Sequence, residues 1–357
     1  MTASGWSASA RRAAPDDMAG VHRGVTADAA APLLDVRQLS IHFGEPGDEV
    51  QATRDVSFAI RPGERVGLVG ESGCGKTVTG LSLLGLLPPG RSRVEGAVRF
   101  DGQDLLAQGA RAWRRVRGAQ IGMIFQEPMS ALDPVFTIGQ QIAETLKAHQ
   151  RIDDRQARER AIAALAEVGI PAPERRVDDY PHQLSGGMRQ RAMIAIALVC
   201  RPRLLIADEP TTALDVTIQA QIIDLLLALS ERNGTALLFI THDLGVVAET
   251  CTRVLTMYAG EVVEDAPVGQ ALAAPQHPYT SGLLRSMPRL SERKSRLPSV
   301  PGRVPRLTEM PVGCRFAARC AHARDVCHEL QPLRPAGAQR SVRCVRHDEL
   351  DLPGAST

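Results

Sequence analysis

The sequence predicts an α/β fold in which a helical insertion interrupts a mainly parallel β-sheet. Three observations lead to this prediction. Short apolar runs typical of buried strands alternate with helical segments over most of the chain, a pattern found in parallel sheets. One of these runs, residues 65–69, ends in a glycine-rich loop that opens a helix. Residues 138–200 are mostly helical by pattern and would form the insertion.

The individual elements have their own sequence signals. Residues 34–37, 39–43 and 56–60 alternate apolar and polar side chains, as half-buried antiparallel strands do. Short apolar runs predict further strands at 65–69, 98–100, 121–125, 204–207 and 236–240. Helical spacing of apolar residues predicts helices at 77–87, 158–168 and 219–229. Pro88-Pro89-Gly90 ends the first of these helices, and Asn233-Gly234 ends the last.

Composition excludes several classes of protein. At about 150 residues per domain, 357 residues suggest about two domains, and 44% apolar residues are enough for a sizeable core. With 42 basic and 40 acidic side chains the net charge is +2, which argues against a nucleic-acid-binding protein. No apolar run approaches the roughly 18–20 residues that cross a bilayer. Because residues 1–31 also lack the apolar core of a secretory signal, we expect a cytoplasmic protein.

The chain divides into four regions. Residues 1–32 are rich in alanine and show no periodicity, which predicts a disordered leader in which Met18 could be the true start. The predicted strands and helices fill residues 33–265. A stretch rich in proline, arginine and serine, residues 266–310, is expected to be a linker to a cysteine-rich region at 311–349.

A phosphate-binding loop follows the strand at 65–69. Residues 70–77, GESGCGKT, fit the pattern G-x-x-x-x-G-K-[ST] in its required place between a strand and a helix. Backbone N–H groups and the positive end of the helix surround phosphate oxygens there. Lys76, one of only three lysines in the chain, would reach the β- and γ-phosphates, and Thr77 would ligate Mg²⁺. The predicted nucleotide contacts are Gly70, Ser72, Gly73, Cys74, Gly75, Lys76 and Thr77.

Two carboxylates end the apolar strand at 204–207. Asp208 is placed to hold Mg²⁺, and Glu209 to polarise the water that attacks the nucleotide. Alone, the pair could be no more than a solvated strand end. The phosphate loop earlier in the chain favours the catalytic interpretation.

A second motif, residues 184–191, LSGGMRQR, stands directly before an apolar helix. Ser185 could cap this helix, and the N–H groups of the first turn could bind a phosphate. The alternative is a capping turn without a ligand. Because the motif would lie in the helical insertion, away from its own nucleotide, it makes chemical sense if it serves the ATP of a second subunit. Its predicted nucleotide contacts are Ser185, Gly186, Gly187 and Gln190.

Taken together, these motifs resemble the nucleotide-binding subunits of ABC transporters, over about residues 33–265. The resemblance implies an ABC-type P-loop NTPase domain, with a RecA-like mainly parallel sheet, an antiparallel β subdomain and a helical subdomain at about 138–200. It also implies that Gln126 senses Mg²⁺ and water, that Asp215 belongs to the D-loop, and that His242 is the switch histidine at the γ-phosphate. Phe43 fits the position of the aromatic residue that stacks on adenine, with core packing as the alternative.

The same resemblance implies a mechanism and partners. Two such subunits close around ATP, each site lying between one chain's phosphate loop and the other's residues 184–190, and hydrolysis with Glu209 as base reopens them. The implied partners are a second homologous ATPase subunit, two separate membrane permeases and an external peptide-binding protein, with this chain peripheral on the cytoplasmic face of the bacterial inner membrane. A non-transport ABC ATPase is the less favoured alternative.

Other stretches are similar to the dipeptide/oligopeptide importer ATPases, in particular to the first of their two ATPase subunits. These stretches include 128–134, 180–183, 277–280 and the C-terminal cysteines. The similarity implies peptide cargo, although a nickel chelate, glutathione or an opine could use the same engine.

The four C-terminal cysteines, Cys314, Cys320, Cys327 and Cys344, have the spacing C-x5-C-x6-C-x16-C. In a reducing compartment such a cluster indicates a metal site before disulfides. The spacing matches neither the C-x2–4-C pairs of zinc modules nor the common ferredoxin patterns. The family resemblance implies a 4Fe–4S cluster, and the alternatives are structural zinc, free thiols or disulfides.

Overall fold

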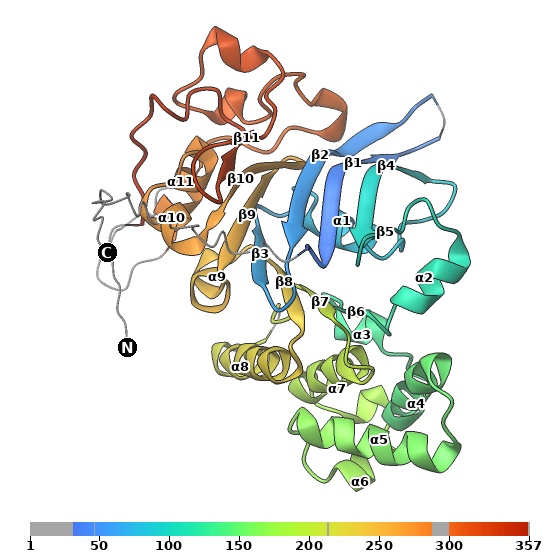
Figure 1. Ribbon diagram of the computed structural model, residues 1–357. Coiled ribbons are helices and arrows are strands. Elements are labelled where there is room, and N and C mark those ends of the chain that lie inside the picture. Colours follow the sequence, from blue (N-terminus) through green and yellow to red (C-terminus); the bar gives the residue numbers. More distant parts are fainter. Residues whose placement is uncertain (1–30, 46, 213, 288–299, 356–357) are drawn as a thin grey trace, which may run out of the picture. The chain divides into compact units, whose positions relative to one another are not determined.

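An eight-stranded sheet forms the centre of the computed structural model, which describes residues 31–45, 47–212, 214–287 and 300–355. Its strand order in these residues is β11-β12-β10-β9-β3-β8-β7-β6 (Figure 1). Five neighbouring strands are parallel: β9 (Arg253–Tyr258), β3 (Arg65–Val69), β8 (Ala236–Thr241), β7 (Leu204–Asp208) and β6 (Ile121–Ile124). The mainly parallel sheet predicted from sequence is confirmed.

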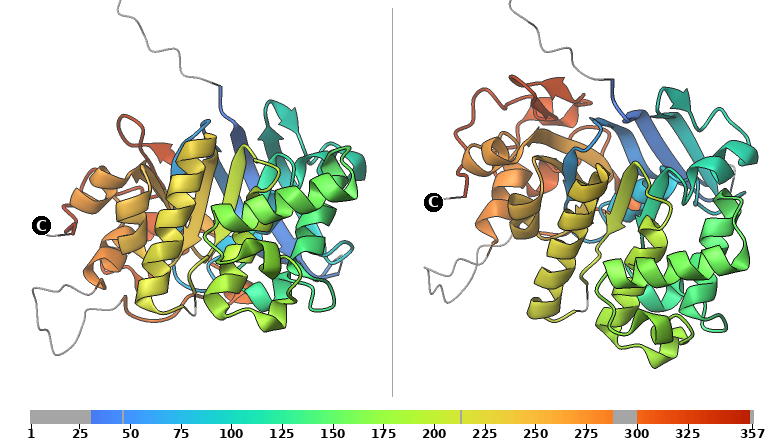
Figure 2. Two further views of the ribbon diagram at one scale, coloured as in Figure 1. Left: turned by 90° about the horizontal axis from the view of Figure 1, so that it is seen from below. Right: turned by 60° about the horizontal axis from the view of Figure 1, so that its bottom comes forward.

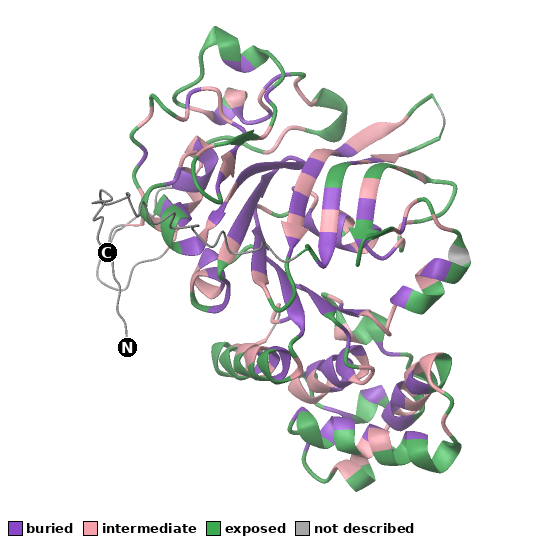
Figure 3. Cartoon of the chain, in the orientation of Figure 1, coloured by how far each residue is buried: buried purple, intermediate pink, exposed green. Residues whose placement is uncertain are grey.

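Both faces of the parallel strands are buried, which is why these strands are wholly apolar runs. Along β7, Leu205 and Ala207 join the core under the helices, whereas Leu204 and Ile206 join the core on the opposite face. Figure 3 shows buried residues concentrated in these strands. The same rigid strands end at the phosphate loop and at Asp208, so packing on both faces fixes the positions of these groups.

A four-stranded antiparallel sheet packs against the eight-stranded sheet through the core that contains Leu204 and Ile206. Its order is β2 (Val50–Ile60), β1 (Leu34–Phe43), β4 (Ser92–Phe100) and β5 (Gln103–Asp104). The sequence pattern predicts two strands at 34–37 and 39–43, but β1 is one strand whose pairing shifts between Val36 and Leu39. Gln38, at φ 49°, absorbs the extra residue as a bulge does. Helix α1 (Lys76–Ser82) is shorter than the predicted helix at 77–87.

The helical insertion contains α4 (Ile138–His149), α5 (Asp154–Glu167), α6 (Pro173–Arg176) and α7 (Gly186–Leu198), which lie together to one side of the sheet (Figure 2). Polar side chains cap the N-terminal ends of α4 and α5. Thr137 and Asp153 each accept the backbone N–H three residues later, and a glutamine reaches back in both cases. The remaining helices of the core are α2 (Ala110–Val116), α3 (Pro128–Ala131), α8 (Val216–Asn233) and α9 (Leu244–Thr250).

Residues 300–355, here called the C-terminal extension, add to the sheet. Strand β12 (Ser341–Val342) pairs antiparallel with β10 (Glu261–Pro267), and β11 (Arg334–Pro335) pairs with β12. Three short 3-10 helices complete the extension: η2 (Leu307–Glu309), η3 (Ala317–Arg319) and η4 (Asp325–His328). Another 3-10 helix, η1 (Pro181–Gln183), lies in the helical insertion.

In its described residues, the region predicted as a linker contains two α-helices, α10 (Val268–Ala273) and α11 (Pro278–Arg285), as well as η2. The predicted disordered leader, with Met18, lies outside the described residues except for its last two positions, as does part of the linker at 288–299. In the described part of the chain, no helix combines the length and apolar composition needed to cross a bilayer.

His277, which caps α11, makes the stability of the fold sensitive to acid. Its Nδ1 accepts the Tyr279 backbone N–H at 3.1 Å, and the ring is buried. Burial, with a smaller effect from the positive charge of Arg343, lowers the pKa of His277 to about 3. The unfolded chain therefore takes up a proton below about pH 6.5 that the folded chain refuses, so stability falls as pH falls from about 6.5 towards 3.

Replacing His277 with asparagine keeps a capping acceptor and removes this titration. We expect the loss of unfolding free energy between pH 7.5 and pH 5.5 to shrink by about 1.4 kcal/mol, measured by urea denaturation at both pH values. The exposed His182, changed to asparagine in the same way, is the control and should leave the pH dependence unchanged. An unchanged slope in His277→Asn would contradict the prediction.

Candidate functional site

A cavity of about 260 Å³ opens between the antiparallel sheet and the carboxyl ends of β3 and β7. Eight residues predicted to contact ATP or act on it line this cavity: Phe43, Ser72, Gly73, Gly75, Lys76, Thr77, Gln126 and Glu209. These residues come from positions 43 to 209 of the chain, and the fold brings them to one place. Gly70 and Cys74 are not among the described lining residues, although they belong to the same loop.

The phosphate loop has a backbone that depends on glycine at two positions. Gly75, at the N-terminal end of α1, has φ 102°, a conformation that other residues rarely adopt. At Gly70 a Cβ atom would lie 2.1 Å from the Met257 carbonyl oxygen. The Cys74 thiol is buried in the core below the loop, and burial raises its pKa. Cys74 is therefore a packing residue in this structure.

Lys76 is buried at the bottom of the loop. Its Nζ donates to the carbonyl oxygens of Gly70 at 2.8 Å and Glu71 at 3.1 Å. Among the described residues that line the cavity it is the only cation. An anion that enters the cavity therefore meets one fixed positive charge and the N-terminal end of α1.

Thr77 and Asp208 form the predicted magnesium pair. The Thr77 hydroxyl donates to Asp208 Oδ1 at 3.3 Å, across 131 residues of sequence. Asp208 is buried, and burial raises its pKa to about 6. A hydroxyl and a carboxylate side by side supply the oxygen ligands that Mg²⁺ prefers. A bound cation would also stabilise the charged form of this buried carboxylate. The residues present fit this metal.

Glu209 is held by three polar neighbours at the wall of the cavity. Its carboxylate accepts from Gln126 Nε2 at 3.2 Å and from Thr212 Oγ1 at 2.8 Å, and lies 3.4 Å from His242 Nδ1. Its backbone has φ 44°, a strained conformation for a residue with a side chain, and such strain is concentrated at functional sites. The structure thus brings together all three predicted catalytic residues. Thr212 was not predicted.

The motif at 184–191 lies apart from this cavity. Ser185 caps α7, accepting the Met188 N–H at 3.4 Å, and Gly186 and Gly187 form the first turn. None of the described residues 184–191 lines the cavity. Gln190 is buried, and its side-chain amide donates to the Pro210 carbonyl oxygen, so here it connects the helical insertion to the Glu209 turn instead of facing a ligand.

Two further placements complete the site. Asp215 caps α8 by accepting the Ile218 N–H at 3.0 Å, so its side chain serves a helix end in this structure. Leu307, in the C-terminal extension, lines the cavity together with Phe43. The sequence offered no signal for Leu307. It is a single apolar residue in a proline-rich stretch, and its neighbours in sequence do not indicate which cavity it lines.

The four cysteines of the extension are free thiols. The Cys314 N–H donates to the Cys327 carbonyl oxygen at 2.8 Å. Burial raises the pKa of Cys314, Cys320 and Cys344, and neighbouring thiols of the same set add to each increase. Over the residues described, however, no three His, Cys, Asp or Glu side chains are arranged to hold a metal ion. As described, the cysteines lie near one another without forming a metal site.

Comparison with known proteins agrees with this geometry. The family model for ABC transporters matches residues 53–212. This range contains the phosphate loop, the motif at 184–191, Asp208 at the end of β7 and Glu209 after it. The model for the oligopeptide/dipeptide transporter C-terminal region matches residues 263–327. The two models together span most of the described core and half of the extension.

Individual relatives support the same family. A Sinorhizobium fredii protein named as a probable peptide ABC transporter ATP-binding protein is 56% identical over 321 residues, 89% of this chain and 96% of the relative. A Brucella melitensis protein named as a peptide import ATP-binding protein is 50% identical over 332 residues, 89% of this chain and 98% of the relative. A solved dimeric ATP-binding cassette, MJ0796 bound to ADP and Pi, is 28% identical with a TM-score of 0.59, over 66% of this chain and 98% of that one. The chain therefore belongs to the ATP-binding subunits of ABC transporters, in the group that carries the oligopeptide/dipeptide transporter C-terminal region.

Proposed function

We propose that this chain powers the uptake of di- or oligopeptides through separate membrane permeases. As a member of its family it is an ATPase coupled to transport. The observation that carries the peptide assignment is the C-terminal region at 263–327, which matches the oligopeptide/dipeptide transporter model and lies outside the ATP-binding core. The two relatives described above, both named for peptide transport, support the same cargo.

We propose the following roles in the ATPase reaction. Lys76 and the N–H groups of the phosphate loop bind the β- and γ-phosphates. Thr77, Asp208 and Gln126 hold Mg²⁺, which when bound neutralises developing charge on the phosphates. Glu209 accepts a proton from the attacking water, and His242 and Gln126, both already in contact with Glu209, orient that water and the γ-phosphate.

The proposed ATP-bound form is a dimer of nucleotide-binding subunits. Ser185, Gly186 and Gly187 lie outside the cavity of their own chain, which supports their contacting the nucleotide of a second homologous ATPase subunit. Phe43 would stack on the adenine ring in the cavity that Leu307 also lines. Asp215, next to the exposed Val216, would lie at the contact between the two subunits.

The proposed permease contact is the surface around 126–137. Met129, Val135 and Phe136 are exposed there, which is unusual for large apolar side chains close together in sequence. This patch supports docking on two membrane permeases, with the chain peripheral on the cytoplasmic face of the inner membrane. An external peptide-binding protein would deliver the cargo.

Uptake in cells tests the cargo assignment. In a strain deleted for this gene, uptake of labelled di- and hexapeptides should return with the wild-type chain and not with Glu209→Gln. Glu231, an exposed glutamate near the C-terminal end of α8, is the control: Glu231→Gln should restore uptake. If peptide uptake does not depend on the gene, the peptide assignment is wrong, and uptake of nickel chelates, glutathione and opines identifies the cargo.

We also propose that the four cysteines of the extension bind a 4Fe–4S cluster, with zinc as the competing metal. Support comes from the backbone hydrogen bond that joins Cys314 to Cys327 and from the mutual effect of the thiols on their pKa values. The described side chains would have to turn toward one another to surround a metal, because no three of them are arranged to hold one. Anaerobically purified protein should show broad visible absorbance that Cys327→Ser abolishes and Cys200→Ser, outside the extension, retains. Colourless protein with bound zinc would show that the metal is zinc.

A further inference from the structure

The C-terminal extension reaches the phosphate loop through one buried ion pair. Arg319, in η3, contacts Glu71, the second residue of the loop, across 248 residues of sequence. Its Nη1 lies 2.7 Å from Glu71 Oε2 and its Nη2 lies 3.0 Å from Glu71 Oε1, so the contact is bidentate. The Arg319 side chain is 5% exposed and that of Glu71 28%. A bidentate pair that is largely shielded from water is screened less by solvent and salt than an exposed one, and its geometry is more specific.

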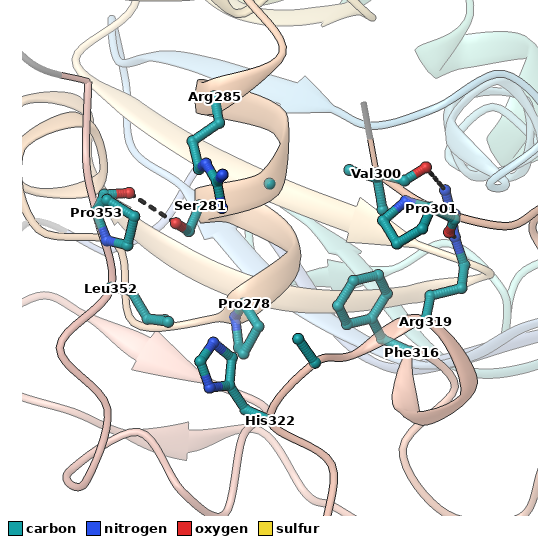
Figure 4. Close-up of a pocket in the computed structure, with 12 residues that line it drawn as sticks. Pro278, Ser281, Arg285, Val300, Pro301, Phe316, Arg319, His322, Leu352 and Pro353 are labelled. Atoms are coloured by element: carbon teal, nitrogen blue, oxygen red, sulfur yellow. Dashed lines mark hydrogen bonds between the residues drawn. The ribbon is translucent and has the colours of Figure 1, made fainter. Parts of the chain in front are cut away.

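The guanidinium of Arg319 is held in place by contacts other than the one with Glu71. Its Nε donates to the Pro301 carbonyl oxygen at 2.7 Å, and Nη2 also donates to Val300 at 3.1 Å. Its plane lies near the rings of Tyr258, at 5.6 Å, and Phe316, at 5.9 Å. Figure 4 shows Arg319 between Phe316 and the 300–301 backbone. A rigid guanidinium loses little freedom when it binds a carboxylate.

Glu71 is held by its backbone as well. Its N–H donates to the hydroxyl of Tyr279 at 2.9 Å, and Tyr279, in α11, is fully buried. The carbonyl oxygen of Glu71 accepts from Lys76 Nζ. One residue of the phosphate loop therefore connects the lysine that faces the nucleotide with a tyrosine and an arginine from beyond the core.

The charge of Glu71 poses an electrostatic problem that Arg319 solves. The loop binds an anion, and a free carboxylate inside it would repel the triphosphate. At an effective dielectric constant of about 20, a like charge about 10 Å away costs on the order of a tenfold loss in affinity. The bidentate pair neutralises this carboxylate without adding a second cation to the cavity.

We propose that Arg319 is a positioning residue for nucleotide binding, which acts through Glu71. It cancels the negative charge in the phosphate loop and holds the loop open for phosphate, so the C-terminal extension sets the affinity of the site for ATP. This inference rests on the proposed role of residues 70–77 in binding ATP.

A charge-cancelling role and a purely structural role predict different results for a double variant. Arg319→Gln should raise the Kd for a fluorescent ATP analogue and the KM for ATP about tenfold, with kcat within about twofold. Glu71→Gln alone should lower the Kd, by up to about tenfold, because Arg319 then remains as an unpaired cation beside the loop. In the double variant the Kd should return to within about threefold of wild type, since no unpaired carboxylate is left in the loop.

The extension offers a matched control. Arg340 pairs with Glu264 of β10 and is as buried as Arg319, but its contacts lie away from the phosphate loop. Arg340→Gln should lower the melting temperature and leave the Kd for the ATP analogue unchanged. A shift in Kd with Arg340→Gln equal to that with Arg319→Gln would mean that any damage to the extension weakens binding, which overturns the proposal.

Other results are equally decisive. If Arg319→Gln does not fold, Arg319→Met removes the same charge with a flexible apolar side chain and should raise the Kd by the same factor, whereas Arg319→Lys keeps the charge and should bind within about threefold of wild type. The proposal is wrong if Arg319→Gln, or Arg319→Met in its place, binds the analogue like wild type, or if adding Glu71→Gln to that variant fails to restore binding. If wild-type protein itself does not bind the analogue, the assignment of the phosphate loop fails instead.

Discussion

Replacing Glu209 with glutamine is expected to lower ATP turnover by about 10²–10⁴-fold while ATP still binds. Glutamine has nearly the same shape and can still contact Gln126 and Thr212, which now hold the carboxylate at 3.2 and 2.8 Å. What it loses is the ability to take a proton from water. Single-turnover hydrolysis measures the first effect, and titration with a fluorescent ATP analogue measures the second.

The same variant should also accumulate the closed dimer. Because hydrolysis is proposed to reopen the two subunits, Glu209→Gln mixed with the second ATPase subunit, ATP and Mg²⁺ should elute with it as a dimer from size exclusion, and wild type should not. Glu231→Gln removes an exposed carboxylate near the C-terminal end of α8 and should leave turnover within about twofold of wild type. Full turnover in Glu209→Gln would remove Glu209 from the proposed base role.

Replacing Lys76 with methionine is expected to weaken ATP binding by about 10- to 100-fold, because hydrogen bonds to charged groups contribute about 1.5–3 kcal/mol. Lys76 is the only cation among the described residues lining the cavity, and methionine fills a similar volume. The measurement is titration with the same ATP analogue, accompanied by a melting temperature to show that the protein is folded.

Lys147 provides the control for this substitution. It lies on α4 and pairs with Asp154 on the surface, so Lys147→Met removes the same charge away from the cavity and should bind ATP like wild type. The two variants are expected to differ in kind. Glu209→Gln should lose ATP turnover but still bind ATP, whereas Lys76→Met should lose ATP binding itself. Equal affinity in Lys76→Met and wild type would contradict the proposed phosphate contact.

Local pattern was enough for the part of the fold that makes the site. The apolar run at 65–69 became β3, and the run at 204–207 became β7 with Asp208 at its end. Both are buried on two faces, so their composition alone indicates a parallel sheet. The phosphate-binding motif that follows β3 has fixed spacing, which is why its contacts with the nucleotide could be predicted residue by residue.

Contacts between distant segments could not be predicted in this way. Strands β11 and β12 have two residues each and leave no periodicity to detect. Glu71 occupies a variable position of the phosphate motif, so its pairing with Arg319 has no local signal. Gln190 was predicted as a ligand contact from its motif, but burial against Pro210 decides its orientation here. Tertiary packing determines each of these three outcomes.

The pairing of β12 with β10 bears on how such proteins can be recombined. The extension completes the same sheet that carries the phosphate loop, so it is not a detachable module. Cutting the chain after β10 would leave that strand as an open edge, which invites aggregation, and would uncover Tyr258 and Val263. A chimera that exchanges the extension between two paralogous subunits has to exchange β9, β10 and α11 with it. Core and extension are therefore expected to be inherited, duplicated and lost as one unit.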